Sequence, residues 1–142
     1  MIFVIDSNIL ISALIRDATT RKILITSECT FYYPEIAFHE IRKYEKLVLE
    51  KSGMSKIEYS EVLSRLLKYI ILVPKEQFSH NLREANEILG KIDVKDVVFL
   101  AVAMSIENSK IWSNDPHLRK QEKVRTLRTE DIIKLLEYNL EK

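Results

Sequence analysis

The segment IFVIDSNIL, residues 2–10, joins a short apolar run to three polar residues that favour the start of a helix. Residues 2–5 are all apolar and largely β-branched, which is typical of a strand buried on both faces of a parallel sheet. Residues 6–8 are Asp, Ser and Asn, which cap helices, and apolar residues at helical spacing follow them. The chain therefore begins with a buried strand, a tight turn and a helix.

The rest of the chain continues this alternation of strands and helices. Short apolar runs predict strands over residues 30–33, 69–73, 110–112 and 124–127. Capping residues, including an S-x-x-E capping box at 55–58, and apolar periodicity predict helices over residues 19–24, 34–51, 55–67, 74–89, 93–104 and 129–138. No internal repeat or low-complexity linker interrupts the pattern. It predicts one domain over residues 1–142, an α/β fold built as a three-layer α/β/α sandwich with a mostly parallel central sheet.

Length and composition exclude several classes of protein. The 142 residues fit one domain, and 46% hydrophobic with 30% charged residues is the composition of a globular protein with a core. Lysine and arginine total 22 against 21 acids, a formal net charge of +1. Because no global field attracts nucleic acid, any such binding must use a local patch.

The number of cysteines and glycines and the length of the apolar runs exclude further classes of protein. A single cysteine, Cys29, excludes an internal disulfide and a cysteine zinc cluster, and with no signal peptide it predicts a cytoplasmic protein. The longest apolar run, residues 97–104, is too short to span a membrane. The two glycines, Gly53 and Gly90, cannot form the G-x-G-x-x-G motif or the phosphate loop of P-loop proteins.

Four aspartates lie where the predicted sheet would bind a ligand. Asp6 follows the first strand, Asp115 follows the strand at 110–112, and Asp93 and Asp96 begin the helix before that strand. Open parallel sheets bind ligands outside the carboxyl ends of their strands. These acids are therefore candidates for a shared site.

Glu40 is the fifth candidate, and its case depends on helical geometry. In the helix predicted from Pro34 it projects into an arc of apolar residues, namely Ile36, Ala37, Ile41, Tyr44, Leu47 and Val48. A carboxylate on a buried face costs several kcal/mol unless it is paired or bound to a metal. Pairing with Arg42 or Lys43 is the alternative, although both point away from this arc.

Each aspartate taken alone also fits a simpler role. Asp6, Asp93 and Asp115 could each cap a helix, with Pro116 in the first helical position after Asp115 and Asp96 completing a capping box with Asp93. Together, however, four carboxylates at one sheet edge repel, at about 4 kcal/mol for each pair 4 Å apart in an effective dielectric near 20. A cation removes that cost. Oxygen ligands without cysteine favour Mg²⁺ or Mn²⁺ over zinc.

Four segments of the sequence resemble the PIN domain, a metal-dependent ribonuclease fold that includes the VapC-type toxins. Residues 5–10 resemble its opening D-[ST]-N motif, and residues 38–41 resemble the segment that carries its conserved glutamate. Residues 93–103 resemble D-x-x-D followed by an apolar, alanine-rich helix, and residues 111–118 resemble the closing strand with [ST]-N-D. Each motif alone is weak, but their order and spacing fit over nearly the whole chain.

The resemblance implies an Mg²⁺- or Mn²⁺-dependent endoribonuclease that hydrolyses RNA phosphodiester bonds. It implies that the metal is held by catalytic carboxylates, which are Asp6, Glu40, Asp96 and Asp115, with Asp93 as an outer ligand. It further implies that four polar residues orient the carboxylates or a metal-bound water, namely Ser7, Asn8, Ser113 and Asn114. The toxin of a type II toxin–antitoxin pair, with an antitoxin partner and a homodimeric state, is the specific role that it suggests.

RNA must also meet positive charge at the rim of an acidic pocket. The predicted RNA-binding residues are Arg16, Arg42, Lys43, Arg119 and Lys120, which end the first helix, flank Glu40 or follow Asp115. His117 fits either a structural role or a contact to phosphate, whereas His39 and His80 are expected on the surface.

Two other functions remain open at this point. A PIN scaffold could bind RNA or protein without cutting, although all the acids are intact. A phosphatase could use Asp6 as its nucleophile, but Asn8 stands where its D-x-D motif needs a second aspartate.

Overall fold

The computed structural model describes residues 1–15 and 18–141, with side chains up to Glu137. Its centre is a five-stranded sheet in the order β3-β2-β1-β4-β5. The strands are β1 (Ile2–Ile5), β2 (Thr30–Pro34), β3 (Ile70–Val73), β4 (Ser109–Trp112) and β5 (Thr126–Leu127). Every neighbouring pair is parallel, so the predicted strands and the α/β class are confirmed, and the sheet is parallel throughout.

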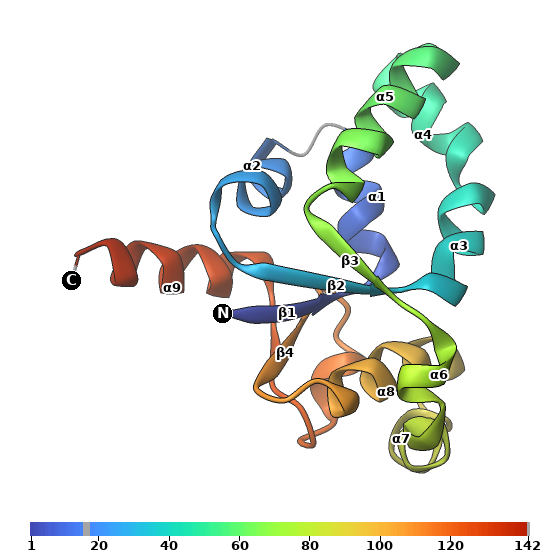
Figure 1. Cartoon of the computed structure of the whole chain (residues 1–142), viewed down its shortest axis with the longest axis vertical. Helices are drawn as coiled ribbons and strands as arrows, with labels where there is room; N and C mark the ends of the chain where they lie inside the picture. Colours follow the sequence, from blue (N-terminus) through green and yellow to red (C-terminus); the bar gives the residue numbers. More distant parts are fainter. Residues whose placement is uncertain (16–17, 142) are drawn as a thin grey trace.

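Helices fill the connections between the strands (Figure 1). The α-helices are α1 (Ser7–Ile15), α2 (Ala18–Thr26), α3 (Phe38–Lys43), α4 (Glu45–Ser52), α5 (Lys56–Leu67), α6 (Lys75–Phe78), α7 (Leu82–Leu89), α8 (Val97–Ser105) and α9 (Thr129–Glu141). Short 3₁₀ helices are η1 (Glu35–Ala37), η2 (Ser79–Asn81), η3 (Val94–Asp96) and η4 (Leu118–Lys120).

The two faces of the sheet carry separate cores, as the alternation of side chains along β1 requires. Phe3 and Ile5 belong to the core shared with α1, α2, α4, α5 and α9, whereas Val4 belongs to the core shared with α6, α7 and α8. Figure 1 shows α1 to α5 on one side of the strands and α6 to α8 on the other. The three-layer α/β/α sandwich is therefore confirmed.

The helix predicted without interruption over residues 34–51 is wrong. Pro34 ends β2, η1 follows it, and Tyr44 separates α3 from α4 with φ −96° and ψ 5°. The break lets α3 and α4 pack separately against α1. It also changes the phase of the apolar arc, so Ile36 and Leu47, which that arc placed inside, are 42% and 38% exposed.

The continuous helix predicted over residues 74–89 is also wrong. It divides into α6, η2 and α7, because the polar residues 79–81 form a 3₁₀ turn in which the Asn81 side chain donates to Ser105 Oγ at 2.6 Å. Apolar residues predicted to face the core are nevertheless buried, namely Phe78, Ala85 and Leu89. The capping box at Ser55 is confirmed.

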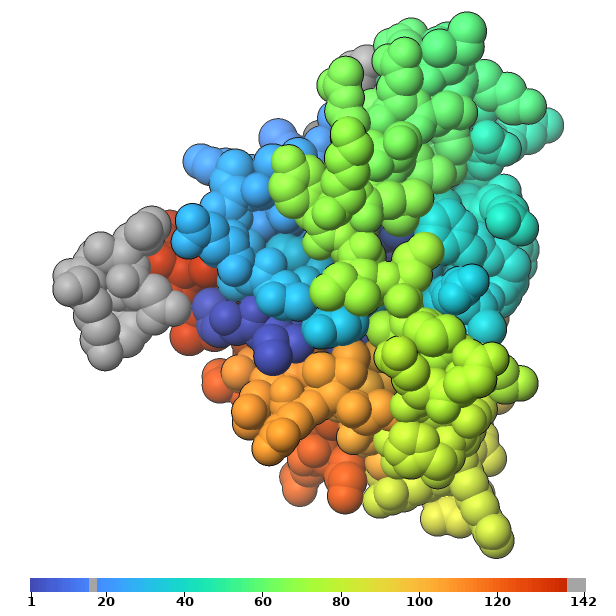
Figure 2. Space-filling view, in the orientation of Figure 1, coloured from blue at the N-terminus to red at the C-terminus, as the bar shows by residue number. Residues whose placement is uncertain are grey.

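One edge of the sheet lies at the surface. Figure 2 shows this face of the molecule, with the green residues of β3 between the two helical layers. Ile71 and Leu72 of β3 are 49% and 37% exposed. Within the described part of the chain, no helix combines the length and hydrophobicity that a membrane span requires.

Candidate metal centre

The candidate site lies at the carboxyl ends of β1 and β4, which are adjacent strands in the middle of the sheet. From β1 the chain reaches β2 through helices on one face of the sheet, and from β3 it reaches β4 through helices on the other face. Such a reversal leaves a crevice outside the strand ends, which is where open α/β sheets bind ligands. Asp6 directly follows β1, and Ser113 to Asp115 directly follow β4.

Asp6 both caps a helix and lies in the site. Its Oδ1 accepts a hydrogen bond from the Ile9 backbone N–H at 3.0 Å, at the start of α1, and its Oδ2 accepts one from Ser113 Oγ. Burial raises the pKa of Asp6 to about 6, because the hydrogen bonds from Ser113 and Ile9 only partly offset desolvation and the charges of Asp115 and Glu40 raise it further. The capping role is thus real, and it does not remove Asp6 from the site.

Asp96 is the least compensated acid of the group. It is 6% exposed, and its Oδ2 has no hydrogen-bond partner among the described residues. Burial raises its pKa to about 7, with further increases from the charges of Asp115, Asp93 and Asp6 and a small opposing effect of His117. A buried carboxylate oxygen without a partner costs free energy unless a proton or a cation meets it.

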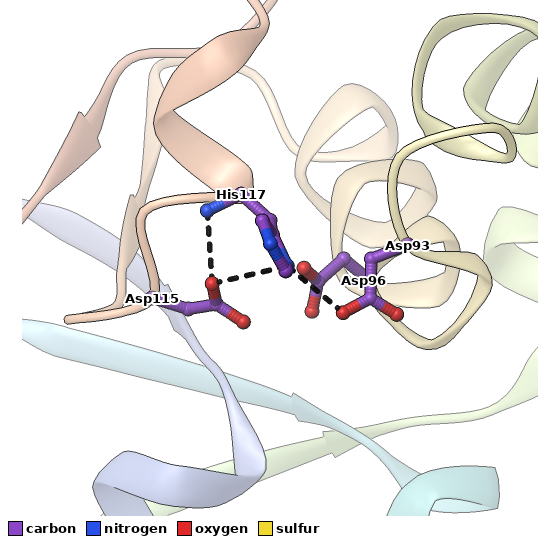
Figure 3. Close-up of side chains that lie close together, drawn as sticks. All are labelled: Asp93, Asp96, Asp115 and His117. Carbon is purple, nitrogen blue, oxygen red and sulfur yellow. Dashed lines mark hydrogen bonds and ion pairs between the residues drawn. The ribbon is translucent and has the colours of Figure 1, made fainter.

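Asp93, Asp115 and His117 meet Asp96 at the mouth of the site (Figure 3). Asp93 accepts from the Lys95 backbone N–H at 2.9 Å and lies 3.2 Å, Oδ2 to Nδ1, from His117. Asp115 Oδ1 accepts from the His117 backbone N–H at 2.8 Å and lies 3.5 Å from its Nδ1. One ligand atom from each of these four residues lies within 4.8 Å of the others.

All five predicted carboxylates line one cavity of about 310 Å³, namely Asp6, Glu40, Asp93, Asp96 and Asp115. Glu40 enters from the first turn of α3 and is half-buried. The five acids named from the sequence thus share one cavity, although the continuous buried arc used to place Glu40 does not exist. Two lysines, Lys43 and Lys95, also line the cavity and place positive charge beside the acids.

Of the four polar residues predicted to orient the acids, three lie at the site. Ser113 Oγ donates to Asp6 and accepts from the Asp115 backbone N–H at 3.0 Å, so it joins the two strand ends. Ser7 and Asn8 line the cavity, with Ser7 Oγ 2.7 Å from the Tyr33 hydroxyl. Asn114 turns away, because its side chain bonds the Thr129 hydroxyl and backbone N–H.

The predicted RNA-binding cations divide into three groups. Lys43 lines the cavity, whereas Arg42, Arg119 and Lys120 are exposed without lining it. Arg16 lies outside the described residues.

Sequence reasoning missed Lys95 and His39 at the site, and it left His117 between a structural role and a contact to phosphate. Lys95 lies between the two aspartates of D-x-x-D, so its place in that motif could have predicted that it lines the cavity. His39 also lines the cavity, next to Glu40 in the chain. His117 lies two residues beyond Asp115, but its closeness to Asp93 is visible only in three dimensions.

The donor set fits a divalent cation. Three carboxylates at close range repel one another, and Asp96 Oδ2 offers a ligand atom that no other described residue engages. Carboxylate oxygens are the ligands of Mg²⁺ and Mn²⁺.

Comparison with known proteins agrees with the site. A family model described as PIN domain matches residues 4–134 of the chain, which include all five carboxylates. No curated protein matches the sequence. Because the family match extends over most of the 142 residues, the chain belongs to the PIN domain family, as the four motifs predicted.

Proposed function

We propose that this PIN domain is a metal-dependent endoribonuclease that hydrolyses RNA phosphodiester bonds in the acidic cavity. Membership of the PIN family indicates a nuclease. The observation that supports the proposal best is the convergence of five carboxylates in one cavity, where the buried Asp96 Oδ2 has no partner in the described part of the chain.

The five carboxylates would divide into metal ligands and one residue at the mouth of the cavity. Asp6, Glu40, Asp96 and Asp115 would hold Mg²⁺ or Mn²⁺, with Asp93 at the mouth. Bound there, the cation supplies Lewis-acid chemistry, lowering the pKa of a water and offsetting charge on the phosphate. Ser113 holds Asp6 and the Asp115 backbone in register, so the two strand ends present their acids together.

The lysines of the cavity supply the charge that RNA needs. Lys43 on α3 and Lys95 in η3 stand at the same cavity as the acids. Their ammonium groups attract phosphates that the carboxylates alone would repel. Replacement of either lysine should weaken RNA binding more than metal binding.

Cleavage of labelled RNA tests the proposal. Wild type and Asp96→Asn are incubated with single-stranded RNA, or with DNA of the same sequence, in Mn²⁺, Mg²⁺ or EDTA. Wild type should cut RNA only with metal, and Asp96→Asn should not cut. Glu107→Gln, an exposed acid beyond the far end of α8, is the control and should cut as wild type does.

Other outcomes of that assay are equally informative. Cleavage of DNA alone would keep the nuclease and reject RNA as its substrate. Folded wild type that binds RNA without cutting it under any condition would favour the binding scaffold. Cleavage that survives both EDTA and Asp96→Asn would reject the acidic cavity as its source.

A toxin role is the more specific form of this proposal, and it rests on the resemblance of the motifs to VapC-type toxins. Expression of wild type in a bacterial host should then arrest growth, whereas Asp96→Asn should not. The expected homodimer is checked by the mass of the purified protein in solution, and an antitoxin by co-purification with the product of a neighbouring gene. Normal growth with folded wild type would argue against the toxin role and leave the nuclease untouched.

A further inference from the structure

His117 faces the acids although it is not one of them. The backbone N–H of His117 donates to Asp115 Oδ1 at 2.8 Å, which folds the turn through Pro116 back on itself. The ring then lies between two carboxylates, with Nδ1 3.2 Å from Asp93 and 3.5 Å from Asp115 (Figure 3). The turn therefore holds a ring nitrogen beside Asp93 and Asp115, two of the acids that line the cavity.

The spacing of these atoms suits a common ion. One ring nitrogen and one oxygen from each of Asp93, Asp96 and Asp115 all lie within 4.8 Å of one another. Ligands about 2.1 Å from an ion and on opposite sides of it are about 4.2 Å apart, so a small contraction brings this set into range. The second observation is the Oδ2 atom of Asp96, a residue of this set, which is buried and has no hydrogen-bond partner among the described residues.

We propose that His117 supplies a nitrogen ligand to the metal of this cavity and thereby makes the site prefer Mn²⁺ and other transition-metal cations to Mg²⁺. The inference rests on the proposed metal-dependent function and specifies its metal. Mg²⁺ takes oxygen ligands and keeps its waters, whereas imidazole nitrogen binds transition-metal ions in preference. Because this set contains a histidine, its donor atoms also suit zinc, unlike a set made of oxygen atoms alone.

His39 provides a matched comparison in the same cavity. It lines the pocket, but its Nδ1 lies 2.8 Å from the Ile36 carbonyl oxygen, and it is not part of the four-residue set. His80 lies in η2 and is exposed, outside the residues that line the cavity. The three histidines of the chain are thus separable by single substitutions.

Pulsed electron paramagnetic resonance of bound Mn²⁺ gives the most direct test. Wild type carrying Mn²⁺ should show coupling of the ion to ¹⁴N, and labelling histidine with ¹⁵N should change that coupling. The coupling should vanish in His117→Gln and persist in His39→Gln and His80→Gln. The wild-type spectrum is informative even if a variant fails to fold.

Calorimetry of metal binding supplies the second readout. His117→Gln should weaken Mn²⁺ binding about tenfold or more, as loss of a ligand requires, while Mg²⁺ affinity changes much less. Equal losses for both ions, or ¹⁴N coupling that disappears only in His39→Gln, would overturn the proposal. Mn²⁺ bound without any ¹⁴N coupling would overturn it and leave the nuclease function standing, whereas wild type that binds no divalent cation would overturn both.

Discussion

At the scale of single residues, Asp96 is the acid whose replacement should stabilise the metal-free protein. Its carboxylate is buried, its Oδ2 has no hydrogen-bond partner among the residues that the structure describes, and the charges of Asp115, Asp93 and Asp6 lie nearby. We expect Asp96→Asn to raise the free energy of unfolding in EDTA at pH 8 by about 1–3 kcal/mol, because a buried charge disappears. Urea denaturation measures this change, and calorimetry should show that Mn²⁺ binding is lost.

Glu107→Gln is the matched control for that substitution. Glu107 is exposed and lies outside the cavity, so its free energy of unfolding should stay within about 0.5 kcal/mol of wild type. A destabilised Asp96→Asn would mean that the carboxylate holds the fold through contacts of its own, against its role as a ligand.

The raised pKa values of Asp6 and Asp96 also predict how the metal-free protein responds to pH. Both groups have a pKa near 3.8 when unfolded and about 6 and 7 when folded, so the folded chain binds more protons between these values. Stability is therefore greatest below the unfolded pKa and declines as pH rises through the folded pKa. The free energy of unfolding in EDTA should fall from pH 5 to pH 8.

Asp96→Asn again separates this effect from the titration of other groups. The decline between pH 5 and pH 8 should be shallower in this variant than in wild type, since one of the two acids no longer titrates. Identical slopes for both proteins would assign the pH dependence to residues outside the cavity.

The acids of the site were predictable, but their surroundings were not. Asp6, Asp93, Asp96 and Asp115 each stand at a strand end or helix start, so local sequence signals locate them. His117 contacts Asp93 from a different segment of the chain, and no local pattern reports such a contact. Asn114 shows the opposite error. Its position in the motif predicted a side chain in the site, but that side chain bonds Thr129 instead.

At the scale of elements, Tyr33 connects β2 to α1, which Asp6 caps, and to η1, which precedes the helix of Glu40. Its hydroxyl donates to the Ala37 carbonyl oxygen at 2.9 Å and lies 2.7 Å from Ser7 Oγ, and the side chain is fully buried. Tyr33→Phe should cost about 1–3 kcal/mol of stability, because it leaves buried polar atoms of Ser7 and Ala37 without that partner. Chemical denaturation measures the loss.

Tyr69→Phe is the control for the loss of a hydroxyl. Tyr69 precedes β3 and is 44% exposed, so water replaces any interaction of its hydroxyl and the expected change is within about 0.5 kcal/mol. If Tyr33→Phe costs no more than Tyr69→Phe, the hydroxyl does not hold β2 to α1.

Element boundaries were harder to predict than element types. The strands follow from short apolar runs between polar turns, and the structure has all five of those predicted. The helix over residues 34–51 looked continuous because apolar residues fell on one arc, yet packing against α1 favours two helices joined at Tyr44. Because α3 and α4 each keep an apolar face, the sequence pattern alone does not reveal the break that tertiary packing favours.

At the scale of the whole molecule, the site draws its acids from widely separated segments. Asp6 follows β1, Glu40 lies in α3, Asp93 caps η3, Asp96 is its last residue, and Asp115 follows β4. An ion that binds them stabilises the folded chain relative to the unfolded one, by about 2.7 kcal/mol at a hundred times its dissociation constant. The melting temperature should therefore rise with Mn²⁺ concentration.

Thermal melts of wild type and Asp115→Asn across a Mn²⁺ titration check this prediction. The rise should be present in wild type and in Glu107→Gln, and largely absent in Asp115→Asn. A rise of the same size in all three proteins would indicate that Mn²⁺ binds elsewhere.

The sequence predicted the class of the fold better than its arrangement. Alternating strands and helices imply a parallel sheet, because parallel neighbours need crossovers. The order β3-β2-β1-β4-β5 depends on which faces the helices cover, and that choice is made by packing across the sheet. No single segment encodes it.

The pairing of β1 with β4 joins the beginning of the chain to its last third. Asp6 and Ser113, which share a hydrogen bond, are 107 positions apart. As a ribosome synthesises the protein from its N-terminus, the pocket cannot close until β4 has been made and has reached β1. For a protein proposed to cut RNA, the growing chain would therefore lack a complete acidic cavity while it is still beside the messenger and ribosomal RNA.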